Sequence, residues 1–265
     1  MLAFPTDFGF YAFAIPAVLL AGISKAGFGG ATAGLAVVFI TQATGSPATA
    51  AAIMLPLLCT IDLFGVKAYW THIDWRLLKR MLPAAIVGTI VGALTWRHFS
   101  VPGLKAILGV IAIAFPLQWW WKDWRASRPN APARIVDRDG KDRVRAALWC
   151  AMSGFTSFVA HAGGPPVLAY LMPKKMDKTI QVGTMSFFFL VVNYVKLPQY
   201  IAVGQFSPQV LGASLVLAPF IPLGVWMGIK LHNNISQRTF QQSCYVLMLI
   251  MGTKLLFEAL PILIG

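Results

Sequence analysis

Apolar runs of about twenty residues, the length an α-helix needs to cross the hydrocarbon core of a bilayer, recur along this 265-residue chain. Two of these runs are interrupted by glycine-rich breaks. Hydrophobic residues make up 57% of the chain and charged residues only 12%, against about 25% charged residues in a soluble domain. The sequence therefore predicts an all-α, polytopic membrane protein.

The apolar pattern predicts ten helical segments, four of which are the pieces on either side of the two breaks. They are 9–24, 27–42, 48–69, 77–96, 103–121, 146–161, 163–172, 179–202, 208–230 and 239–262. We expect short pieces in the broken segments, at 9–42 and 146–172. The first segment has no basic flank and no small-residue cleavage site, which favours a structural element over a cleaved signal peptide.

The two breaks have similar sequences. Residues 22–34 read Gly-Ile-Ser-Lys-Ala-Gly-Phe-Gly-Gly-Ala-Thr-Ala-Gly, and residues 154–166 read Gly-Phe-Thr-Ser-Phe-Val-Ala-His-Ala-Gly-Gly-Pro-Pro. Lys25 and His161 occupy matching places as the one basic residue of each run. In hydrocarbon, interrupted backbone is tolerated only where it is buried in protein or lines a watery cavity. Paired breaks in two halves are typical of a transporter whose binding site lies near the bilayer midplane.

Aligning the two halves by eye gives three sets of matches at one offset. These are Lys25 with His161, Gly88 and Gly92 with Gly224 and Gly228, and Phe99-Ser100 with Ile235-Ser236. The middle of the alignment needs a gap, and there Asp62 falls near Asn193. The expected units are a first repeat at 1–121, a charged cytoplasmic loop at 122–145 and a second repeat at 146–265. The paired glycines are expected to form helix-packing faces.

The net charge of +13 is distributed as in a membrane protein rather than a nucleic-acid-binding one. Eight of the 22 Lys and Arg residues lie between Lys122 and Arg145. If that loop is cytoplasmic and each broken segment is a re-entrant hairpin, the external stretches hold only Arg97 and Lys105, as the positive-inside rule requires. Each half then has two half-helices and three spanning helices, so the second half is inverted and both termini lie outside.

The candidate substrate-binding residues of the first break are Ser24, Lys25, Gly27, Gly29 and Gly30. We expect a half-helix to begin at the glycines just after Lys25. Free backbone N–H groups and the positive end of the helix dipole would favour an anion there, and the Lys25 ammonium would add a full charge. The alternative is that Lys25 snorkels to the interface along a short half-helix.

The corresponding candidates of the second break are His161, Gly163 and Gly164. The two glycines would allow close approach of the backbone, and Pro165-Pro166 suits the first turn of a following helix. A histidine here could pair with an anion when protonated, or carry a coupling proton. The alternative is a buried histidine with a packing role.

A second group of polar residues comprises Asp62, Lys67, Asn193 and Lys196. Asn193 and Lys196 share a helix face, so both could reach one ligand. Asp62 is a candidate counter-charge of Lys25 or Lys196, and Lys67 is a candidate for charge pairing or coupling. Purely structural ion pairs, or snorkelling of Lys67 and Lys196, are the alternatives.

No other pattern in the sequence points to chemistry. The three cysteines have neither metal-binding nor disulfide spacing, and we find no nucleophile set and no metal cluster; the cysteines are Cys59, Cys150 and Cys244. We therefore expect no catalytic residue, no metal and no cofactor. His72, His98 and His232 fall in predicted loops or helix ends and are expected to be solvated.

The glycine-rich break early in each half, the Asn193-Tyr-Val-Lys196 pattern and the charged central loop resemble the TauE/SafE family of sulfite and sulfonate permeases. The resemblance extends from about residue 10 to residue 261. It implies a multi-pass protein of the bacterial inner membrane that moves sulfite, organosulfonates or other small organic anions, with protons or an anion gradient as the coupling force. By resemblance, Gly27, Gly29 and Gly30 match the first family break, and Gly163 and Gly164 the second.

The apolar interior holds four lysines but one clear acid, which also favours an anionic ligand. A lysine is a point charge and suits a small, hydrated oxyanion. We therefore expect a secondary transporter of a sulfur-containing anion that works by alternating access, with the bilayer and the anion as partners and no nucleic acid. The alternatives are an intramembrane lipid-phosphate hydrolase, which would need paired carboxylates or a Ser/His set, and an anion channel.

Overall fold

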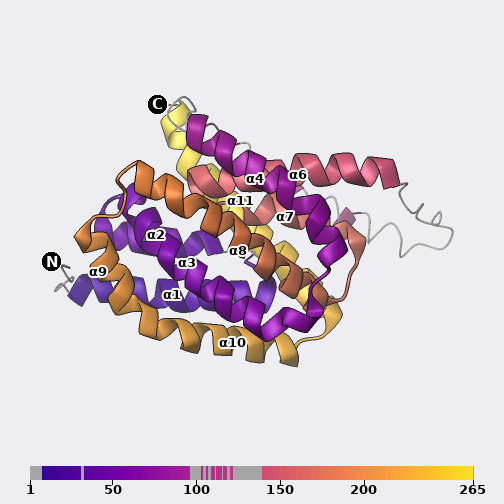
Figure 1. Ribbon diagram of the computed structural model, residues 1–265, viewed down its shortest axis with the longest axis horizontal. Coiled ribbons are helices and arrows are strands. Elements are labelled where there is room, and N and C mark those ends of the chain that lie inside the picture. The colour runs from indigo at the N-terminus through magenta and orange to yellow at the C-terminus, as the bar shows by residue number, and fades with distance from the viewer. Residues whose placement is uncertain are drawn as a thin grey trace.

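The computed structural model describes residues 8–30, 33–95 and 139–264, together with scattered residues between 103 and 121. All regular elements among these residues are helices (Figure 1). Six spans in the described part of the chain are long and apolar enough to cross a membrane: Phe8–Phe28, Ala48–His72, Trp75–Thr95, Lys178–Ala202, Pro208–Asn234 and Gln237–Leu260. The predicted all-α, polytopic class is confirmed.

The described helices follow the predicted order closely. They are α1 (Phe8–Phe28), α2 (Ala33–Thr44), α3 (Pro47–Tyr69), η1 (Trp70–His72), α4 (Trp75–Thr95), α6 (Asp139–Ala160), α7 (Gly164–Leu171), η2 (Met172–Lys174), α8 (Lys178–Ala202), α9 (Pro208–Leu217), η3 (Ala218–Phe220), α10 (Ile221–Asn234) and α11 (Gln237–Ile264). The described residues of the predicted span at 103–121 are helical, and the others lie outside the described residues.

The first helix of each broken segment is longer than predicted. α1 has 21 residues and α6 has 22, whereas α2 and α7 have 12 and 8. The prediction of short pieces was wrong for α1 because Gly27 stays helical, at a cost of only about 1 kcal/mol. The chain turns only where Gly29 and Gly30 adopt positive φ angles of 64° and 85°. α6 begins at Asp139, so the end of the predicted loop at 122–145 is helical.

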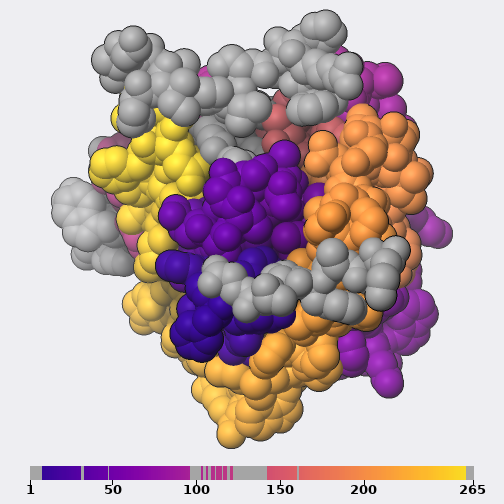
Figure 2. Space-filling view, turned by 90° about the vertical axis from the view of Figure 1, so that its left-hand side faces the viewer, coloured from indigo at the N-terminus to yellow at the C-terminus, as the bar shows by residue number. Residues whose placement is uncertain are grey.

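The helix connections gather at two ends of the molecule (Figure 1). We call the end with the connections 70–74 and 172–177 the inner end. There the backbone N–H of Lys178 donates a hydrogen bond of 2.8 Å to the side-chain oxygen of Gln237 and joins α8 to α11. The basic residues of these connections and the adjoining turns are Arg76, Lys79, Arg80, Lys174, Lys175 and Lys178. The opposite end, which we call the outer end, faces the viewer in Figure 2. Its connection 203–207 holds no basic residue. By the positive-inside rule we expect the inner end to face the cytoplasm.

Each broken segment begins and finishes at the same end of the molecule. Phe10 of α1 and Thr44 of α2 line one pocket at the outer end, whereas Asp142 of α6 and Lys174 of η2 form an ion pair at the inner end. The returning helix α2 is about 18 Å long at 1.5 Å per residue, a little over half of a hydrocarbon core about 30 Å thick. The longer α1 reaches almost to the inner ends of α3 and α10, where Tyr69 and His232 contact the carbonyls of Ala26 and Gly27.

Glycine faces pack each broken segment against a helix of the other predicted half. A Cβ added at Gly22 of α1 would lie 2.7 Å from the backbone of Gly224 in α10. A Cβ at Gly88 of α4 would collide with the carbonyl oxygen of Ala151 in α6. Only glycine permits backbones this close, so the predicted packing role of the glycine pairs is confirmed.

Candidate functional site

Lys25 and Asp62 form a buried ion pair. Lys25 lies in the last turn of α1 and is 5% exposed, and Asp62 on α3 is 1% exposed. The Lys25 Nζ atom is 2.6 Å from Asp62 Oδ1 and lies 4.9 Å from the ring centre of Phe189. Of the two partners considered for Asp62, Lys25 is thus the one it pairs with, and the Lys25 side chain does not snorkel.

Asn193 holds the other oxygen of the same carboxylate. Its side-chain Nδ2 donates a hydrogen bond of 2.6 Å to Asp62 Oδ2. Both oxygens of Asp62 are therefore engaged, one by a cation from α1 and one by an amide from α8. This chain of contacts ties α1, α3 and α8 together, and it joins the two residues that fall near each other in the alignment of the halves.

Lys196 is buried completely but has neutral partners. Its exposed fraction is 0%, and its Nζ donates hydrogen bonds of 3.1 Å to the backbone carbonyl and to the hydroxyl of Ser157 on α6. No carboxylate of the described residues lies within ion-pair distance of this ammonium. A buried charge without a close opposite charge is costly, and such a position in a membrane helix indicates function.

His161 forms the second break itself. It adopts a left-handed φ of 51°, which is uncommon outside glycine. Its ring Nε2 is buried and has no hydrogen-bond partner among the described residues, and its ring meets that of Tyr200 edge to face at 6.3 Å between centres. His161 directly follows the last residue of α6, one turn after Ser157, whose carbonyl and hydroxyl Lys196 contacts.

The turn after His161 is held by side chains of its own helix. The Ser153 hydroxyl donates to the Gly163 carbonyl at 2.7 Å, and the Thr156 hydroxyl donates to the Ala162 carbonyl at 3.2 Å. A Cβ at Gly163 would lie 2.8 Å from the Ser153 carbonyl, so glycine is required there. α7 then begins at Gly164 and has proline in its first turn, as predicted.

The two breaks meet in the structure. A Cβ added at Gly30 would lie 3.6 Å from the Phe189 ring, and one added at Gly163 would lie 3.2 Å from the other edge of that ring. At the start of α2, a Cβ on Gly34 would lie 2.8 Å from the His161 carbonyl. Both turns therefore pack on one phenylalanine of α8, and the charged groups of Lys25 and Lys196 both act electrostatically on the His161 ring.

A family model described as Sulfite exporter TauE/SafE matches residues 14–255, which include both breaks and the whole charge cluster. The chain belongs to the TauE/SafE family. TauE/SafE proteins are membrane transporters of sulfite-type anions, so this chain is a multi-pass transporter and not an enzyme, and the hydrolase alternative is excluded. No curated protein and no solved structure gives a significant match.

Within this TauE/SafE chain, one prediction about Lys25 is wrong. It lies on the carbonyl end of α1 rather than just before a helix start, because the break comes after Phe28. The carbonyls of that end have donors of their own: Tyr69 donates to Ala26 at 2.8 Å, and the His232 ring lies 3.1 Å from the Gly27 carbonyl. The negative end of the α1 dipole therefore faces Lys25 and favours the cation.

His232 is buried, with an exposed fraction of 0%, although we expected it to be solvated. The available signal is its spacing. His232 follows Gly228 by four residues, so it continues the glycine face of α10 that packs on α1. His72 is exposed, as expected, and His98 lies outside the described residues.

Of the remaining candidates, Gly29 and Gly30 form a turn, and Lys67 lies away from the site. The backbone N–H groups of Gly29 and Gly30 donate to the carbonyls of Lys25 and Ser24 at 3.1 and 2.9 Å, so these residues close the end of α1. Lys67 is exposed on α3 and is not part of the buried cluster. Ser157 and Tyr200 were not among the predicted site residues, although Tyr200 lies four residues from Lys196 on one face of α8 and Ser157 lies four residues before His161.

Proposed function

We propose that the protein is a secondary transporter of a small sulfur oxyanion, sulfite or an organosulfonate, and that Lys196 and His161 bind this anion. The observation that carries the proposal is the fully buried Lys196 ammonium, which hydrogen-bonds only the neutral oxygens of Ser157. A bound anion would supply the missing opposite charge. The Nε2 atom of His161 has no partner among the described residues. When this nitrogen carries a proton, it can donate a second hydrogen bond to the anion.

Lys25 has a different role in this proposal. Its charge is already balanced by Asp62 at 2.6 Å, so an incoming anion would gain less from it than from Lys196. We therefore assign Lys25, Asp62 and Asn193 to a polar network that fixes α1, α3 and α8 around the binding site. Asp62 and His161 are the two groups of the cluster that could carry a coupling proton.

The donor types favour a small oxyanion over a bulky ligand. Lysine and histidine supply single N–H donors, whereas arginine would supply the fork that holds a carboxylate or sulfonate in two places. No arginine belongs to the buried residues of the described chain. A compact anion such as sulfite can accept one hydrogen bond from each donor without a large cavity.

We further propose that the two halves are inverted repeats that rock against each other to give alternating access. The two hairpins enter from opposite ends, and each packs by glycine contacts on a helix of the other half, as a two-fold relation would produce. The outer end contains an open pocket, whereas ion pairs and hydrogen bonds such as Lys178 with the Ile235 carbonyl hold the inner end closed.

Counterflow in proteoliposomes tests the proposal. We expect saturable exchange of labelled sulfite, and a reduction in affinity of at least about tenfold in Lys196→Gln, since a hydrogen bond to a charged group contributes about 1.5–3 kcal/mol. Lys67→Gln is the matched control, because it removes an exposed lysine from the same protein, and should exchange normally. Normal exchange by Lys196→Gln would overturn the assignment, and single-channel currents would indicate a channel instead.

A further inference from the structure

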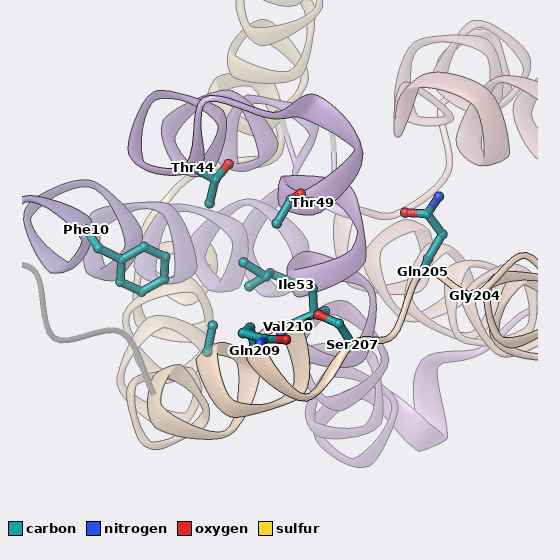
Figure 3. A pocket seen from close by; sticks show the side chains of 10 residues that line it. Phe10, Thr44, Thr49, Ile53, Gly204, Gln205, Ser207, Gln209 and Val210 are labelled. Carbon is teal, nitrogen blue, oxygen red and sulfur yellow. Dashed lines mark hydrogen bonds between the residues drawn. The ribbon is translucent and has the colours of Figure 1, made fainter. Parts of the chain in front are cut away.

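A pocket of about 390 Å³ opens at the outer end between α1, α2, α3 and the start of α9. Hydroxyl and amide side chains make up half of its lining (Figure 3); these residues are Thr44, Thr49, Gln205, Ser207 and Gln209. None of the described residues that line it is charged. Neutral polar walls of this kind can solvate a small hydrated anion without binding it tightly, which suits an entrance rather than a final binding site.

Tyr200 contacts both the 203–207 connection, part of which lines this pocket, and the second break. On the outer side, its carbonyl accepts a hydrogen bond of 3.0 Å from the Gln205 N–H, and its ring is 6.1 Å from that of Phe206. On the inner side, its ring meets those of His161 and Phe158 at 6.3 and 5.6 Å. Tyr200 is 7% exposed, and its ring is packed among the rings of Phe158, His161 and Phe206.

We propose that the pocket is the outer vestibule of the transport path and that the Tyr200 ring is the gate between this vestibule and the Lys196–His161 site. The proposal rests on the proposed function, because it takes that site as the destination of the anion. Tyr200 follows Lys196 by four residues, so a rotation of its side chain would open the path directly over the ammonium. Such a rotation moves one ring and leaves α8 in place.

Cys59 provides a native probe for this gate. It lies on α3, one turn nearer the outer end than Asp62, and is 5% exposed. Cys59 and Asp62 are three residues apart on α3, so their side chains share a helix face, and the thiol lies next to the cluster along that face. The other two cysteines, Cys150 and Cys244, are also buried and can be replaced by alanine so that one thiol remains.

The experiment measures how fast a membrane-impermeant, anionic methanethiosulfonate labels Cys59 from the outer side of intact vesicles. We expect Tyr200→Ala to be labelled at least about tenfold faster than the single-cysteine parent, because labelling of a buried group follows the population of the open form. Tyr200→Phe should keep the slow rate, since the ring is retained. Tyr200→Leu gives the same test in a variant that keeps apolar volume, and it should be labelled faster than Tyr200→Phe.

Tyr194→Ala is the matched control, because Tyr194 is an exposed tyrosine of the same helix; its labelling should stay slow. Equal rates in Tyr200→Ala, Tyr200→Leu and Tyr194→Ala would overturn the gate. Labelling does not require transport, so this outcome is separable from a failure of the proposed function. Absence of sulfite counterflow in the parent protein would reject the proposed function. The labelling rates would still show whether the Tyr200 ring blocks access to Cys59 from the outer side.

Discussion

The two breaks share the pattern of a basic residue followed by Ala-Gly, yet the structure treats their charges differently. At the first break the Lys25 ammonium has Asp62 at 2.6 Å. At the second break His161 has an unpartnered Nε2, and Lys196 nearby contacts only the neutral oxygens of Ser157. The first break is neutralised from within the protein, whereas the basic groups at the second have no acidic partner among the described residues, and we propose that a ligand anion binds there.

The backbones of the two breaks differ as well. The first turns at Gly29 and Gly30, which adopt positive φ at little steric cost. The second turns at His161 itself, with a φ of 51°, a conformation that costs a non-glycine residue about 1–3 kcal/mol. Backbone strain of this kind clusters at functional sites, so this second difference also points to His161 rather than to Lys25.

The largest effect is expected when the Asp62 carboxylate, which neutralises Lys25 at the first break, is removed. Asp62→Asn should lower the free energy of unfolding by about 3–5 kcal/mol, because it leaves the buried Lys25 ammonium without an opposite charge. The measurement is the thermal unfolding midpoint of the purified protein in detergent. The double variant Lys25→Met/Asp62→Asn should recover much of the loss, and a double variant as unstable as Asp62→Asn would show that the pair is not coupled.

At the second break the expected effect is on ligand binding rather than on stability. His161→Gln should weaken sulfite binding by about tenfold or more, as expected for one hydrogen bond to a charged ligand. It should also flatten the pH dependence of transport, because glutamine cannot gain or lose a proton. Thermal shift by sulfite and counterflow across a pH series measure the two effects. A pH profile identical to that of the parent protein would reject His161 as the proton carrier.

Alanine substitutions at the two turns should differ in how much stability they cost. Gly163→Ala should cost about 1–3 kcal/mol by overpacking, because its Cβ would lie 2.8 Å from a backbone carbonyl and 2.9 Å from the Ser157 Cβ. Gly30→Ala should cost about 1 kcal/mol, from its positive φ alone, since its nearest neighbours lie at ordinary contact distances. Unfolding midpoints check the order, and a larger loss in Gly30→Ala would contradict it.

The smallest effect on stability is expected at the partly exposed ion pair of Asp142 and Lys174 at the inner end. Burial alone would raise the pKa of the Asp142 carboxyl, but hydrogen bonds from Lys174 and Tyr170 and the charge of Arg80 bring it below the ordinary value. The stabilisation is therefore present above the ordinary aspartate pKa of about 3.9 and is lost as the pH falls through the lowered pKa. Asp142→Asn should cost less than about 1 kcal/mol at neutral pH.

Melting curves of the parent protein and of Asp142→Asn across a pH series check this prediction. The two midpoints should differ near neutral pH and converge in acid, because protonation of Asp142 removes the same charge that the substitution removes. A difference that stays constant from neutral pH into acid would show that the Asp142 charge contributes nothing to stability.

Much of the fold and part of the site could be predicted from the sequence. The long apolar runs and the paired glycines of α4 and α10 gave the spans and their packing faces, because both signals are local. The length of α1 was missed, since nothing local shows that Gly27 stays helical while Gly29 does not. Ser157 and Tyr200 were missed because a hydroxyl and a ring in an apolar run carry no signal of their own.

The amino-acid sequence by itself determined a polytopic helical protein with two breaks, a basic interior and a TauE/SafE resemblance. The lengths of the apolar runs, the positions of the glycines and the number of charges can all be read from the order of the residues. Only the tertiary structure decided which buried lysine has a counter-ion. Lys25 and Lys196 look alike in the sequence, but Asp62 comes within 2.6 Å of one alone. Ion pairing depends on distances between residues far apart in the chain, and folding sets those distances.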